Sequence, residues 1–281
     1  MNAVPNTRKP LWRKVIRNPA IIVGACIIGG FLLTALLAPW IAPHPPDFRD
    51  GQNLPPSATH WLGTDSHEKD VLTRVIYGAR LSLLAGTASI TVAILLGVPL
   101  GLWAGYRRGW VDIWIMRGVD VWLAFPSLLI AFLVIAALRP GWLPVILAVG
   151  LINLPVFVRQ VRAVVITLRQ QAYVEAAVAS GATPWYVVTR VLFPGTWGTI
   201  LVLTTLGLGH AILEVAGLSF LGIAGDPSSP DWGGMLVEAK SYLHTTLWPA
   251  IAPGIAISAT ILGFNLLGDG LRDLFDTRLK T

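Results

Sequence analysis

The chain alternates between long apolar blocks and shorter polar connections. A helix of roughly 20 apolar residues crosses a bilayer core about 30 Å thick, and six blocks reach or approach that length. The pattern therefore predicts an all-α integral membrane protein with six transmembrane helices. The predicted spans are residues 19–42, 79–106, 113–138, 142–157, 196–224 and 247–267.

The polar connections divide the chain into a tail, a long outer segment and a core. Residues 1–18 form a basic N-terminal tail, and residues 43–78 form a connection rich in Pro, Asp and His. Residues 79–281 hold the other five spans, with an amphipathic connection at 158–195 and a polar C-terminal tail. The first apolar block, 19–42, is longer than the roughly 7–15 apolar residues of a signal peptide, so we expect it to remain as an uncleaved span.

The composition agrees with a membrane protein. Of the 281 residues, 54% are hydrophobic and 13% are charged, whereas a soluble domain is about 25% charged. This hydrophobicity excludes a disordered chain, and the single cysteine, Cys26, excludes a disulfide scaffold and a cysteine-based zinc site. The sequence has no G-x-x-x-x-G-K-[ST] phosphate-binding loop, so any ATP must be bound by another chain.

The positive charges indicate orientation rather than a nucleic-acid partner. The formal net charge is +6, but the cations lie between apolar blocks and form no dense basic stripe. Cytoplasmic loops of membrane proteins carry an excess of Lys and Arg. With the N-terminus inside, most of the 21 Lys and Arg residues fall on the inner side. This predicts a multi-pass protein of the cytoplasmic membrane, with both termini in the cytoplasm and no nucleic-acid partner.

The connection at 158–195 has the pattern of two short helices with a glycine corner. Residues 173–180 are good helix formers, and Gly181 is a usual helix terminator. Thr183 followed by Pro184 fits an N-cap and the first helical position, and a second short helix is expected to end at Phe193. The small side chains of the first helix leave a low profile that a groove on another protein can accept.

This connection resembles the EAA loop of binding-protein-dependent ABC importer permeases. The resemblance rests on the sequence EAA at 175–177, a glycine four residues later, and LFP at 192–194. In that family the loop is the coupling helix that docks into the ATPase subunit. The resemblance therefore assigns ATPase coupling to Glu175, Ala176, Ala177 and Gly181.

Three further segments resemble the dipeptide, oligopeptide and nickel permeases of the same family. HWLGTD at 60–65 and YGARLS at 77–82 precede or begin the second span. Glu214 and GLSFLG at 217–222 end the fifth span, and NLLGDGLRD at 265–273 forms the C-terminal tail. In this order the motifs cover nearly the whole chain, and the first span with its long outer segment is similar to the C-type subunit.

The resemblance implies a transmembrane subunit of an ATP-driven importer that works by alternating access. Its expected cargo is a peptide or a related small solute, with nickel or a metal chelate as the alternative. The implied partners are a second homologous permease, two ATPase subunits that bind ATP and Mg, and an extracytoplasmic solute-binding protein. The chain itself is expected to have no catalytic residue and to bind no cofactor.

Two polar residues fall late in the fifth span. His210 and Glu214 are four residues apart and so share a helix face, and an ionised group near the bilayer centre costs about 3 kcal/mol. We expect the pair to line or gate the translocation path, or to fix the packing of two spans. A proton-driven secondary transporter would use the same pair as its relay. An intramembrane enzyme is disfavoured because four serines have no evident base partner: Ser89, Ser127, Ser219 and Ser258.

Charged residues also follow the last span. Asp269, Arg272 and Asp273 have the spacing at which opposite charges stabilise a helix end. The other interpretation, carried by the resemblance, is contact with the ATPase or with the coupling loop.

The outer segment contains a cluster of potential metal ligands. The members are His60, Asp65, His67, Glu68 and Asp70, and such groups also suit a transition metal. Asp and His equally cap turns and solvate loops, so we expect no metal site here. At 68–69 the sequence is EK where the family commonly has Gly-Arg.

Overall fold

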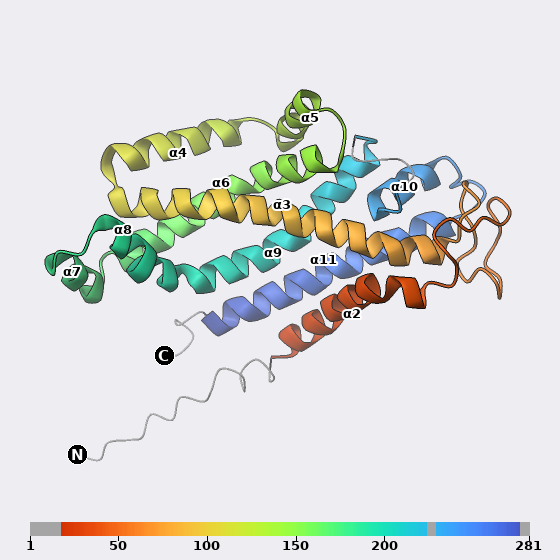
Figure 1. The fold of residues 1–281 in the computed structure, drawn as a ribbon, viewed down its shortest axis with the longest axis horizontal. Coiled ribbons are helices and arrows are strands. Elements are labelled where there is room, and N and C mark those ends of the chain that lie inside the picture. The colour runs from red at the N-terminus through yellow and green to blue at the C-terminus, as the bar shows by residue number, and fades with distance from the viewer. Residues whose placement is uncertain (1–17, 224–228, 276–281) are drawn as a thin grey trace, which may run out of the picture.

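The computed structural model describes residues 18–223 and 229–275. Within those ranges the regular elements are helices, with one isolated bridge between Thr64 and Asp70. Five helices are long and apolar enough to cross a membrane, and a bent pair makes a sixth candidate span. The all-helical prediction is therefore confirmed. The five long helices run along the longest axis of the molecule (Figure 1): α2 (Pro19–Ile41), α3 (Val71–Arg107), α6 (Trp142–Leu168), α9 (Phe193–Phe220) and α11 (Trp248–Phe275).

The third predicted span is broken into two helices. α4 (Gly109–Ala124) and α5 (Ser127–Leu138) meet at an angle of 94°. Phe125 has an extended backbone, with φ −90° and ψ 139°, because a residue that precedes proline is disfavoured in the helical region. Pro126 then starts α5. The span predicted over 113–138 is therefore a pair of helices with a sharp bend at Pro126.

Three other helices extend beyond their predicted bounds, and one of them is α11, which continues to Phe275 instead of ending near residue 267. α3 begins at Val71 rather than at residue 79, because the carboxylate of Asp70 caps it by accepting a hydrogen bond of 2.8 Å from the backbone N–H of Thr73. α6 continues to Leu168 instead of ending near residue 157. The outer segment is accordingly residues 43–70. The connection predicted at 158–195, called the inner connection below, is shorter than predicted.

The inner connection joins α9 without a break. α8 (Pro184–Tyr186) runs through a π-helical turn (Val187–Leu192) into α9, so that Pro184–Phe220 is one helical stretch of 37 residues. We expected a helix end before Pro194. That proline instead lies inside the continuous stretch, directly after the π-helical turn and at the start of α9.

The centre of the molecule is a close contact between α3 and α6. Gly97, Gly101 and Gly105 of α3 lie one turn apart, and each faces α6 so closely that an added Cβ would come within 2.8 Å of it. They meet a face of α6 that includes Phe157 and Val161, both almost fully buried. Small residues that let two backbones approach are typical of helix contacts in membranes.

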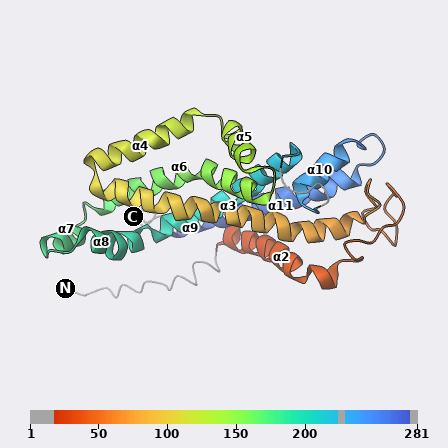
Figure 2. The same cartoon turned by 45° about the horizontal axis from the view of Figure 1, so that its top comes forward.

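The two ends of the molecule carry different structures. α7 (Ala172–Ala179) and α8 lie at one end, whereas the outer segment and α10 (Trp232–Lys240) lie at the other end (Figures 1 and 2). α2 lies along α11 at the edge of the bundle in both views. Candidate sites at the two ends are therefore separated by the full length of the helices.

Candidate functional site

The inner connection holds α7 at the tip of the molecule. Val174 is fully buried in the main hydrophobic core and anchors α7. After α7 the chain turns at Gly181, whose φ of +80° is a conformation that glycine adopts without strain. The hydroxyl of Thr183 then accepts a hydrogen bond of 3.3 Å from the backbone N–H of Tyr186 and caps α8. The structure thus contains the predicted glycine corner between two helices.

The outward side of this connection is exposed. Glu175, Ala176 and Gly181 are exposed, and Ala177 is half-buried. Four neighbouring apolar or aromatic side chains are each more than half exposed. An exposed apolar patch with a polar rim is typical of a protein interaction site. We call this surface the α7 face, and its members are Tyr173, Glu175, Ala176, Ala177, Val178, Gly181, Trp185 and Tyr186.

Aromatic contacts brace the α7 face against the core helices. The ring of Trp185 lies 6.4 Å from that of Trp103 in α3, measured between centroids. The guanidinium of Arg169 lies 5.7 Å from the ring of Tyr106, and that of Arg107 lies 5.6 Å from Trp103. The contact between Trp185 and Trp103 therefore joins the α7 face to the C-terminal end of α3.

Glu214 has a partner that the sequence did not suggest. The side-chain amide of Asn153, in α6, donates a hydrogen bond of 2.7 Å to the carboxylate of Glu214, in α9. The same amide donates to the backbone carbonyl of Val149 at 2.9 Å. His210 is exposed on the surface of this single chain, and the described residues show no contact between it and Glu214. The one sequence feature that pointed to this partner was an amide side chain inside the apolar block 142–157.

The charges that follow the last span do not pair with one another. Asp269, Arg272 and Asp273 are exposed, and no ion pair joins them in the described part of the chain. Arg272 instead lines a hollow of about 370 Å³ with Gln160 and Phe275. The described residues therefore do not form the expected helix-end ion pairs, and Arg272 faces the hollow instead.

Ion pairs that the sequence analysis did not anticipate join α4 to α6. Arg162 donates to both carboxylate oxygens of Asp112, at 2.5 and 2.6 Å. Arg159 donates to Asp120 at 2.7 Å. A bidentate arginine–carboxylate contact is directional, so the Arg162–Asp112 pair orients α4 on α6 although α4 buries little of its own surface.

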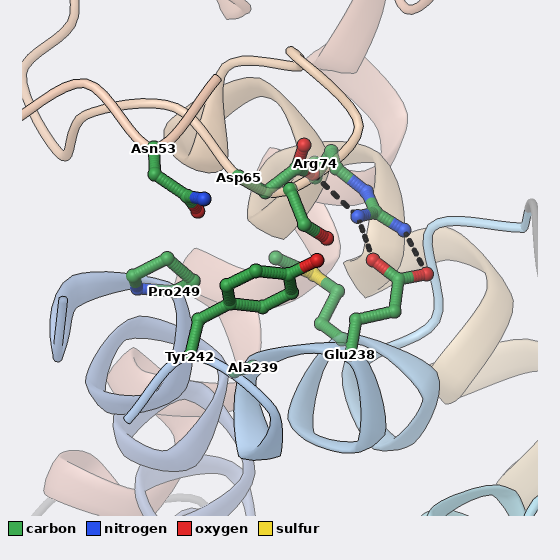
Figure 3. Close-up of a pocket in the computed structure, with 9 residues that line it drawn as sticks. Asn53, Asp65, Arg74, Glu238, Ala239, Tyr242 and Pro249 are labelled. Carbon is green, nitrogen blue, oxygen red and sulfur yellow. Dashed lines mark hydrogen bonds and ion pairs between the residues drawn. The ribbon is translucent and has the colours of Figure 1, made fainter. Parts of the chain in front are cut away.

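At the outer end, a buried arginine joins three parts of the chain (Figure 3). Arg74, in the first turn of α3, donates to Asp65 of the outer segment at 2.5 Å. It also makes a two-pronged contact with Glu238 of α10, one bond of which is 3.1 Å. Arg74 and Asp65 are almost fully buried. Removing Arg74 would leave the buried carboxylate of Asp65 uncompensated, which costs about 3–5 kcal/mol.

A buried histidine lies between two carboxylates in the same segment. The Nδ1 of His60 is 3.0 Å from Asp70, and its Nε2 is 3.2 Å from Asp50. Burial opposes a charge on this ring, but the hydrogen bonds to Asp70 and Asp50 outweigh it and raise the pKa of His60 above its ordinary value. The predicted cluster is thus divided between His60 with Asp70 and Asp65 with Arg74, and Glu68 stays exposed.

Comparison with known proteins identifies the family. Residues 97–281 match the family described as "Binding-protein-dependent transport system inner membrane component", and residues 9–56 match "N-terminal TM domain of oligopeptide transport permease C". These matches cover both the first span and most of the core. The resemblance seen in the sequence motifs is therefore confirmed.

Individual relatives match over nearly their whole length. The dipeptide transport system permease protein DppC of Alkalihalophilus pseudofirmus is 39% identical over 280 residues, which cover 96% of this chain and 91% of the relative. The glutathione transport system permease protein GsiD of Escherichia coli O6:K15:H31 is 40% identical over 291 residues, which cover 100% and 96%.

A solved structure shows the same fold. A chain of the MetNI methionine ABC transporter, in inward-facing conformations, superposes with a TM-score of 0.60 at 18% identity, covering 72% of this chain and 96% of that chain. The chain belongs to the binding-protein-dependent transport system inner membrane components and is a non-catalytic, multi-pass permease subunit of an ABC importer, a class that works with ATPase and solute-binding-protein partners.

Proposed function

We propose that this permease imports short peptides. The relatives that match over their full length are named for dipeptide and for glutathione transport, and glutathione is itself a tripeptide. A second homologous permease completes the translocation path. Two ATPase subunits bind ATP and Mg, and their hydrolysis of ATP drives transport. Both termini lie in the cytoplasm, in keeping with the excess of Lys and Arg on that side.

The coupling of this permease to its ATPases is the part of the proposal that rests on the α7 face. This face combines the coupling motif, Glu175 to Gly181, with an exposed surface at the tip of the molecule. ATP binding closes the two ATPases, and the α7 face moves with them. Glu175 meets a basic group of the ATPase, and the small side chains of Ala176 and Ala177 let α7 enter its groove. The exposed Asp269, Arg272 and Asp273 lie on the same cytoplasmic side and add contacts.

The continuous helix after the corner transmits this movement to the translocation path. Residues 184–220 form one helical stretch of 37 residues, which is roughly 55 Å long at about 1.5 Å per residue. A push at its α8 end therefore displaces α9, where Glu214 meets Asn153 of α6. We place Glu214 and His210 beside the path that opens to one side and then to the other. Alternating access then results from movement of this helical stretch and needs no catalytic group on this chain.

A charge reversal tests the coupling role. Glu175→Lys, in the assembled complex, should abolish uptake and substrate-stimulated ATP hydrolysis, because it places a cation against the basic partner surface. Glu68→Lys makes the same charge change at an exposed position of the outer segment and should leave both activities unchanged. An assembled Glu175→Lys complex that keeps full coupling would show that the α7 face does not dock with the ATPase.

The cargo is tested separately. Uptake into proteoliposomes with the cognate solute-binding protein should be supported by dipeptides or glutathione and should require ATP. Nickel or a nickel chelate should not compete. Uptake of nickel without peptide uptake would replace the peptide proposal with the metal alternative.

A further inference from the structure

Three residues that are distant in sequence come together at the outer end of the molecule. His44 follows α2, His60 lies in the middle of the outer segment, and Asp70 caps α3. One ligand atom of each lies within 4.8 Å of the other two. His44 was absent from the cluster expected from the sequence, because only the fold brings it next to His60.

The side chains are held in place by further contacts on their far sides. The Nε2 of His60 faces Asp50 at 3.2 Å, and the second carboxylate oxygen of Asp70 accepts a hydrogen bond of 2.8 Å from the backbone N–H of Thr73. This leaves the Nδ1 of His60 and the first oxygen of Asp70 facing each other at 3.0 Å. Histidine ligands of metals usually have a carboxylate or carbonyl on the other ring nitrogen, and His60 with Asp50 has that arrangement.

Contacts outside the three-residue group also orient His44. Its Nε2 lies 3.0 Å from the carbonyl oxygen of Thr59, so this nitrogen carries the proton. The ring stacks on Phe48 at 4.7 Å between centroids. Its backbone N–H donates to the hydroxyl of Thr73 at 3.3 Å. The rings of His44 and His60 therefore lie 4.9 Å apart, between centroids, with little freedom to separate.

A second group with similar spacing behaves differently. Asp65, His67 and Glu238 also place three ligand atoms within 4.8 Å of one another. However, the guanidinium of Arg74 donates to both of these carboxylates, so a cation already occupies the middle of the group. A divalent ion there would be repelled by Arg74 and would have to displace its contacts.

We propose that His44, His60 and Asp70 bind a divalent transition-metal ion of the zinc class. Two imidazoles and one carboxylate suit zinc in preference to magnesium or calcium, and a water molecule would complete a four-coordinate site. His60 and Asp70 are buried, whereas His44 is half-buried and Asp50 is exposed, so the ion enters from the side of His44. Bound metal ties the start of the outer segment to its middle and to the cap of α3.

Without metal, the same contacts require an extra proton. Carboxylates only accept hydrogen bonds, so a His60 that bonds both Asp50 and Asp70 must carry protons on both ring nitrogens. A metal ion replaces the proton between His60 and Asp70. The competing state is therefore a protonated histidine that binds no metal, and a metal titration separates the two.

The test is zinc binding by the purified full complex after chelator treatment and dialysis. Zinc is titrated against a chromophoric chelator, and bound zinc is counted by elemental analysis. We expect wild type to bind one zinc equivalent more than His44→Gln. Asp50→Asn should weaken that site by about 10–100-fold, the usual cost of losing an outer-shell partner.

The matched control is His67→Gln, which removes an exposed histidine from the group that contains Arg74. It should keep the extra zinc equivalent. Equal zinc content in wild type and His44→Gln would overturn the proposal. His60 would then be a protonated histidine that bonds Asp50 and Asp70 without metal. Equal loss of zinc in His44→Gln and His67→Gln would also overturn it. ATP hydrolysis by each variant complex verifies that the complex is assembled.

Discussion

The carboxylate of Glu214 is held by a side chain on another helix. Asn153 donates to it and also to the carbonyl of Val149 within its own helix, so the amide is fixed on both sides. Among the described residues, Asn153 is the side chain that donates to this carboxylate. The Asn153–Glu214 hydrogen bond is therefore a specific connection between α6 and α9, the helix that follows the α7 face.

Replacing Asn153 with Leu tests this connection. The variant leaves the Glu214 carboxylate without its donor, and we expect a loss of about 1–3 kcal/mol in stability. Replacing Glu214 with Leu in the same background should recover most of that loss, because both polar groups are then gone. Thermal unfolding of the four proteins of this double-mutant cycle measures the coupling energy. Coupling below about 0.5 kcal/mol would show that the contact has little influence on stability.

The spacing of polar residues did not predict the partner of Glu214, whereas the EAA motif predicted the position of the α7 face. His210 and Glu214 do lie on one helix face, but the partner of Glu214 comes from α6, and no local pattern relates residue 153 to residue 214. The EAA motif, in contrast, located the α7 face because helix propensity and a glycine terminator are local properties of residues 172–181. His44 was missed for the same reason as Asn153.

At the scale of elements, the glycine corner turns the chain between α7 and α8. Gly181 has φ +80°, and an added Cβ would meet no atom within 4 Å. A substitution there is therefore strained by backbone conformation alone and causes no collision. A substitution at Gly181 therefore tests the backbone conformation of the corner without changing its packing.

Gly181→Ala should destabilise the corner by about 1–2 kcal/mol, the cost of a left-handed conformation for an L-residue, and should weaken coupling without preventing insertion. Gly181→Asn should cost less, since Asn tolerates this region. Hydrogen exchange over residues 172–186 measures the effect. The control is Gly217→Ala, also in open space but within α9. If both alanine variants exchange like wild type, the corner is not under conformational control.

Hydropathy predicted the existence of the long helices, but their bounds depend on tertiary contacts. α3 gains two turns because Asp70 caps it and Arg74 bonds to Glu238, and neither effect is visible in an apolar window. A proline such as Pro126 favours a kink, yet the 94° bend between α4 and α5 depends on where α5 packs. Pro194 predicts a helix end, whereas the π-helical turn before it lets the helix continue.

At the scale of the whole molecule, α2 is an addition to the edge of the core. Its apolar surface is largely exposed, with only five of its residues buried, and it lies chiefly against α11 (Figure 1). The contact depends on close backbone approach: an added Cβ at Gly24 would come within 2.7 Å of the backbone of Gly263 and Leu267. Backbone atoms cannot move aside as a flexible side chain can.

Gly24→Val should therefore separate α2 from α11 and lower the stability of the subunit by about 1–3 kcal/mol, as overpacking does in a tight contact. Gly29→Val and Gly30→Val are matched controls, because they add the same side chain to the same helix where no atom lies within 4 Å. Both controls should unfold like wild type. The measurement is the thermal unfolding midpoint of the detergent-solubilised complex, together with protease cleavage of the outer segment, which links α2 to α3. If Gly24→Val and the two controls gave the same midpoints and cleavage rates, α2 would be held by the outer segment and its Arg74 contacts rather than by the glycine contact with α11.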